Sequence, residues 1–181
     1  MPVFTVIDHE EFTTGTTEWS KTSIPDSYDH LLIKASVRSE AVAENDAFTM
    51  RLNGATTSGD YSVTTLSTTT TSPVSIRESL TSELQCGLTP AANALADTFG
   101  AVTIWIPHYS NADNFKQVLI TQCFPNDSTT DDEWQGSTRA ALFVDSTATP
   151  TTRAITSVTI RRNSSDFAQY SSFTLYGITG A

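Results

Sequence analysis

Short stretches in which apolar and polar residues alternate recur along the whole chain, and turn signals separate them. In one of them Leu31, Ile33, Ala35 and Val37 fall on a single face. Another ends at Asn53-Gly54, a strong signal for a tight turn because both residues tolerate a positive φ. Alternation with a period of two places successive side chains on opposite faces, so the pattern predicts β-strands that each bury one face.

The alternation predicts roughly ten short strands. In chain order the segments are 3–7, 14–24, 31–38, 48–52, 61–66, 74–80, 101–106, 115–124, 138–144, 154–161 and 171–178. Thr and Ser together exceed a quarter of the chain and charged residues make up only 17%. Thr is β-branched and suits a half-exposed strand. An all-β, antiparallel two-sheet sandwich is therefore expected, and since neither a composition break nor a repeat divides residues 1–181, a single domain is expected.

One segment departs from this pattern. Thr89 followed by Pro90 and an alanine-rich run is typical of a helix start, with Thr89 capping and Pro90 at the first helical position. The sequence predicts one short helix near 90–97, packed across an end of the sheets. The Thr/Ser tract 68–72 predicts an exposed loop or a strand edge.

The charge balance argues against nucleic acid as a partner. The net charge is −10, and no cluster of cations exceeds Arg161-Arg162, whereas affinity for nucleic acid grows with the number of phosphates neutralised. No basic segment followed by an apolar run opens the chain, and no stretch approaches the ~20 apolar residues of a membrane helix. A soluble protein made in a cytoplasm, with no membrane contact, is expected.

The two cysteines, Cys86 and Cys123, form neither a C-x-x-C motif nor a zinc-site spacing. Two reduced, buried thiols are the favoured interpretation, and a disulfide between them remains open.

Residues that carry catalysis or bind metals are sparse. His9, His30 and His108 are widely spaced and belong to no recognised catalytic or metal motif. The acidic loop Asn126–Gly136, with Asp127, Asp131, Asp132 and Glu133, is the strongest calcium candidate, but its spacing does not match an EF-hand. A solvated surface loop is the favoured interpretation. The prediction is no catalytic residue, no cofactor and no metal: the chain is not an enzyme.

The three tryptophans are candidates for ligand contact. Trp19, Trp105 and Trp134 could stack on sugars, although packing in the core or at a subunit interface is favoured for each. Trp105 occupies the polar face of an alternating strand and is expected to face outward. Trp134 lies in the acidic loop and is the better candidate for an exposed contact.

Several short sequence phrases follow one another in a fixed order over most of the chain. They are Tyr28–Ala35 with Arg38, Met50–Gly54 followed by Tyr61, Phe99-Gly100, Ile104–Tyr109, Lys116, Ile155–Ile160, Phe167 and Ser172–Ile178. In this order they resemble a family of jelly-roll structural proteins encoded by tailed bacteriophages. The Thr68–Ser72 tract and the acidic loop depart from the family pattern.

The resemblance implies a jelly-roll virion protein without catalytic residues. It implies a head decoration (cement) protein on the capsid exterior that binds the major capsid protein and assembles as a homotrimer, with strand edges, loops and the first residues making the contacts. The alternative is a tail-fibre or receptor-binding domain that recognises host surface glycans. The sandwich pattern begins by Val3 and leaves no docking segment, which favours decoration. A third alternative, unrelated to the family, is the accessory β-sandwich of a bacterial enzyme.

Overall fold

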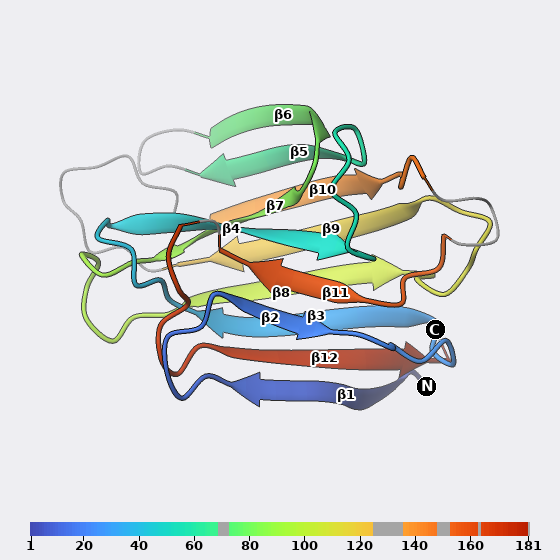
Figure 1. Ribbon diagram of the computed structural model, residues 1–181, viewed down its shortest axis with the longest axis horizontal. Coiled ribbons are helices and arrows are strands. Elements are labelled where there is room, and N and C mark those ends of the chain that lie inside the picture. Colours follow the sequence, from blue (N-terminus) through green and yellow to red (C-terminus); the bar gives the residue numbers. More distant parts are fainter. Residues whose placement is uncertain (69–72, 125–135, 148–152, 163, 181) are drawn as a thin grey trace.

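The computed structural model describes residues 1–68, 73–124, 136–147, 153–162 and 164–180, and Figure 1 shows their arrangement. These residues form twelve β-strands. The strands are β1 (Val3–Glu11), β2 (Glu18–Lys21), β3 (His30–Val37), β4 (Asn45–Leu52), β5 (Tyr61–Thr68), β6 (Pro73–Thr81), β7 (Leu84–Pro90), β8 (Gly100–Pro107), β9 (Lys116–Cys123), β10 (Gly136–Phe143), β11 (Val158–Arg161) and β12 (Ser172–Thr179).

The strands form two sheets in which every pairing is antiparallel. The order in the eight-stranded sheet is β1-β12-β3-β8-β9-β10-β5-β6, and in the four-stranded sheet it is β2-β11-β4-β7. In Figure 1 the four-stranded sheet lies in front of the larger one. Along the chain, only β5–β6 and β8–β9–β10 follow one another within a sheet, and every other connection crosses between the sheets.

One apolar core fills the space between the two sheets. Trp19 of the small sheet stacks on Phe173 of the large sheet, with ring centroids 5.4 Å apart. The predicted alternation accounts for this core: Leu31 and Ile33 are fully buried while Lys34 and Ser36 are exposed. The predicted antiparallel two-sheet, all-β architecture is confirmed.

The helix predicted near 90–97 is wrong, because the described part of the chain contains no helix and 91–99 forms turns. Pro90 is the last residue of β7, and the Thr89 hydroxyl donates to the carbonyl of Val37 (2.6 Å). The guanidinium of Arg38 donates hydrogen bonds to backbone carbonyls that a helix would need for its own hydrogen bonds. Those carbonyls belong to Ala94, Leu95 and Thr98.

The sequence also missed β7. Leu84 and Cys86 are buried in it, but Gly87, with φ of 148°, breaks the alternation where β7 carries one extra residue, Cys86, relative to β4. A glycine inside a strand commonly marks such a bulge. The predicted Asn53-Gly54 turn is confirmed, with φ of 53° and 68° at the two residues.

The two cysteines are free, and only Cys86 is buried. Cys123 is exposed because it occupies an outward position at the end of β9, so the predicted burial is wrong for this residue. Among the described residues no helix is long and apolar enough to cross a membrane.

Candidate interaction surface

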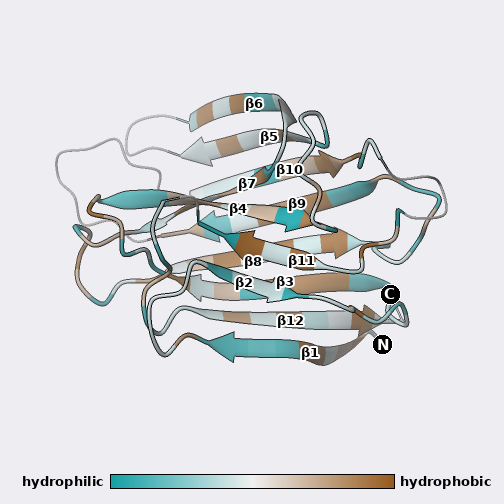
Figure 2. Ribbon diagram, in the orientation of Figure 1, coloured by the Kyte–Doolittle hydropathy of each residue, from teal (hydrophilic) through white to brown (hydrophobic). Residues whose placement is uncertain are grey.

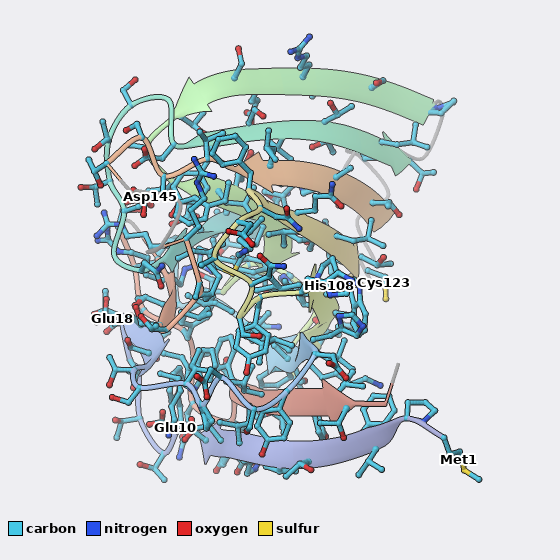
Figure 3. The ribbon with its side chains drawn as sticks, turned by 90° about the vertical axis from the view of Figure 1, so that its right-hand side faces the viewer. Met1, Glu10, Glu18, His108, Cys123 and Asp145 are labelled. Carbon is cyan, nitrogen blue, oxygen red and sulfur yellow. The ribbon has the colours of Figure 1, made fainter. Side chains whose placement is uncertain are left out.

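A row of directly opposed residues crosses the face of the eight-stranded sheet that points away from the four-stranded sheet. The apolar part of this row runs through five neighbouring strands, from β1 to β9. Its members are Val6, Tyr176, Leu32, Trp105 and Leu119. In Figure 3, Met1 and Cys123 lie on this side of the molecule, opposite Glu18 of β2. We call this set the outward row.

The outward row is apolar, exposed at its two ends and half-buried at its three middle members. Val6 is 56% exposed and Leu119 is 45% exposed. Phe4 extends the surface beside Val6, with its ring edge-on to Tyr176 at 6.5 Å, and exposed Leu142 of β10 lies diagonally across from Leu119, opposite Gln117. A contiguous apolar patch that stays exposed on a folded chain typically marks a contact with another macromolecule.

β1 gives this surface a free edge. Among the described strands it pairs only with β12, and it bulges at Ile7, between Val6 and Asp8. Figure 2 shows that its first half is hydrophobic and its second half, toward Glu11, hydrophilic. An edge strand presents unpaired backbone groups that can pair with another chain. The first residues therefore combine exposed apolar side chains with free hydrogen-bonding capacity.

Three rings lie together beside the middle of the outward row, where Trp105 belongs to it. The His30 ring lies 4.7 Å from that of Trp105 and 4.9 Å from that of His108. The backbone N–H of His108 donates to Nδ1 of His30 (3.0 Å), so Nδ1 carries no proton and His30 is held neutral. Burial, together with the neighbouring charge of His108, lowers the pKa of His30 below its ordinary value.

This lowered pKa predicts a loss of stability in mild acid. The unfolded chain binds a proton at His30 near pH 6.5, whereas the folded protein resists protonation until lower pH, so the free energy of unfolding falls as the pH drops below about 6.5. Asn at position 30 keeps an acceptor for the His108 N–H but does not titrate. Urea titrations at pH 7.5 and 5.5 should show a smaller acid loss in His30→Asn than in the wild type.

The matched control is His9→Asn, since His9 is exposed and, within the part of the chain that the structure describes, its ring is hydrogen-bonded only to the Thr174 hydroxyl (2.8 Å). It should retain the wild-type acid loss. Equal losses in His30→Asn and the wild type would contradict the assignment to His30.

A pocket of about 530 Å³ opens beside these rings. The guanidinium of Arg153 lies over the Phe115 ring (4.3 Å to the centroid) and donates to the Asp113 carbonyl (3.1 Å). The remaining lining residues are mostly polar: Pro107, His108, Asn114, Gln117 and Leu142. An aromatic ring among planar polar groups suits a small polar ligand. We call this the rim pocket.

The structure separates the residues that sequence reasoning singled out. Trp19 is fully buried in the core, and Trp105 is half-buried on the outward row as predicted. Trp134 and the acidic residues Asp127, Asp131, Asp132 and Glu133 lie outside the described residues, as does most of the Thr68–Ser72 tract. Within the described residues, no three His, Cys, Asp or Glu side chains are grouped as a metal site.

Comparison with known proteins gives little further guidance. No family model matches the chain, and no curated protein matches it. Among solved structures, the chain is similar to one described as HCR/D-Sa-GBL1/C (TM-score 0.25, 10% identity) and to infectious bursal disease virus, Gx strain (TM-score 0.17, 10% identity). These matches include 93% and 98% of this chain, but only 43% and 41% of the two solved chains. Similarity at this level identifies no common fold, so function is inferred from the geometry of the chain.

Proposed function

We propose that the chain is a structural protein of a virion, built as a jelly roll with two inserted hairpins. When β5, β6, β9 and β10 are left out, the sheet orders become β1-β12-β3-β8 and β2-β11-β4-β7. Each remaining strand then crosses to the other sheet except between β4 and β7, which pair directly. This order supports the proposal, because it is the strand order expected of the double Greek-key winding of a jelly roll, an architecture common among viral capsid domains.

Within a virion, we propose that it decorates the head by binding the major capsid protein on the capsid exterior. The observation that carries this is the outward row, an apolar surface exposed beside a free strand edge. A rigid sandwich that binds across neighbouring shell subunits stabilises the assembled shell by linkage, because it binds that form preferentially. Binding of this kind needs no catalytic group and no cofactor.

Placing a charge in the outward row tests this function. The double variant Val6→Asp, Leu119→Asp would bury two carboxylates in the contact, so its affinity for emptied shells should fall at least about tenfold. Binding is measured by cosedimentation of purified protein with shells that lack it.

Ser20→Asp is the matched control, because Ser20 is exposed on the outward side of the four-stranded sheet. It should bind as the wild type does. Equal coating by the double variant, with its fold verified by circular dichroism, would exclude the outward row as the shell contact.

The second candidate function is glycan recognition by a tail-fibre or receptor-binding domain. The rim pocket favours it, because Phe115 supplies an aromatic face and Asp113, Gln117 and Arg153 supply planar polar groups. A glycan array separates the two functions: binding that is lost in Phe115→Ala supports recognition of sugars. We also propose that the chain assembles as a homotrimer, and light scattering in solution measures the mass of the assembly.

A further inference from the structure

The inner face of the inserted strands becomes polar where the four-stranded sheet ends. Five polar residues on β5, β9 and β10 are buried there, whereas the middle of the same face is apolar, with Val63, Val118, Ile120 and Ala141. They lie in two adjacent cross-strand rows, Gln122–Ser137–Ser67 and Arg139–Thr65. Buried polar groups are costly unless they are hydrogen-bonded, so this region requires an explanation beyond packing.

Arg139 is the charged group in this region, and it is poorly satisfied. Its side chain is 5% exposed. Among the described residues it makes one hydrogen bond, from Nη1 to the Thr65 hydroxyl (3.0 Å), while its buried Nε has no partner. No described carboxylate lies within ion-pair distance of it. Burial lowers the pKa of Arg139, whereas the nearby Cys86 and Glu78 raise it, yet a guanidinium remains charged at neutral pH.

A cavity of about 170 Å³ adjoins the guanidinium, between the inserted strands and β7. A water molecule occupies about 30 Å³ in the liquid, so the cavity has room for a group larger than a single ordered water molecule. Thr65 and Gln85 offer further hydrogen-bonding groups, and Ile76 and Leu88 form apolar walls. Glu78, which is half-buried, is the acidic residue of the lining.

We propose that this cavity binds a small oxyanion, with a carboxylate as the chemical class, through the free side of the Arg139 guanidinium. Two parallel N–H groups of an arginine match the two oxygens of a carboxylate, and the bond is strong when water is excluded. With Nη1 engaged by Thr65, Nε and Nη2 form the available pair. Glu78 repels the anion at close range, so it limits the affinity.

The test uses sodium acetate in place of sodium chloride at constant ionic strength, with the thermal unfolding midpoint as the readout. A ligand that binds only the folded state raises the midpoint with increasing concentration. The midpoint of the wild type should rise with acetate and saturate. Glu78→Gln should bind acetate at least about threefold more tightly, because the repulsion is gone. Arg139→Met should lose the response.

The matched control is Arg77→Met, which removes an exposed arginine from the same strand as Glu78. It should respond as the wild type does. If Arg139→Met does not fold, two other variants still decide the question. Thr65→Val removes the hydroxyl that holds Nη1 of Arg139 and should weaken the acetate response, whereas Glu78→Gln should strengthen it. A wild-type midpoint that does not depend on acetate, or a response that Arg139→Met retains, would overturn the proposal. The site is independent of the shell contact, so either result leaves the proposed function standing.

Discussion

Replacing Trp19 with alanine is expected to lower the free energy of unfolding by about 3–5 kcal/mol. Trp19 has no exposed surface and stacks on Phe173 with the rings nearly parallel, at 7°. Its Nε1–H also donates to Asp8 of β1 (3.2 Å). The indole therefore joins the two sheets and the edge strand, and alanine would leave a large cavity that the flanking strands cannot fill. Urea unfolding followed by circular dichroism measures the loss.

Trp105→Ala is the matched control for this prediction. Trp105 is half-buried on the outward row and lies outside the core, so its loss should cost well under half as much. Equal losses in the two variants would contradict the placement of Trp19 between the sheets.

Replacing Asp46 with alanine is expected to cost about 3–5 kcal/mol, because it leaves a buried cation without its partner. Arg162 has no exposed surface and forms an ion pair with Asp46. Burial lowers the pKa of Arg162 to about 10, so it stays charged at neutral pH. Asp46 also accepts hydrogen bonds from Ser165 (2.6 Å) and Ser39 (2.9 Å), and both would be lost.

Two further variants isolate the buried charge as the cause. Lys21→Ala removes a partly exposed ion pair with Asp8 (3.0 Å) and should cost no more than about 1 kcal/mol. Adding Arg162→Met to Asp46→Ala removes the stranded cation, so the double variant should recover part of the stability. A double variant no more stable than Asp46→Ala would exclude the stranded charge as the origin of the loss.

The sequence predicted the strands wherever one face is regularly apolar, as in Leu31–Val37, because burial imposes a period of two. It failed at 84–97 for two physical reasons. Gly87 interrupts the alternation of β7. The helix-like signal of Thr89-Pro90 is local, whereas the hydrogen bonds that fix the following turns come from Arg38, which directly follows β3 and lies more than fifty residues earlier in the chain. Tertiary contacts override local propensity in such cases.

The candidate surfaces were harder to predict. Trp105 could be placed on an outward face from its own strand, but its neighbours Leu119 and Leu32 are known only from the register between strands. The segment 138–144 contains Arg139 beside mostly apolar residues, and nothing in the sequence indicates that the arginine points inward. Its inward position follows from the pairing of β10 with β5 and β9.

The most direct test of the proposed decoration function is quantitative mass spectrometry of purified phage particles that contain this chain, before and after their tails are removed. If the chain decorates the head, it remains with the tail-less shells at a copy number comparable to that of the major capsid protein. Loss of the chain together with the tails, at only a few copies per particle, would contradict the account and favour the receptor-binding alternative.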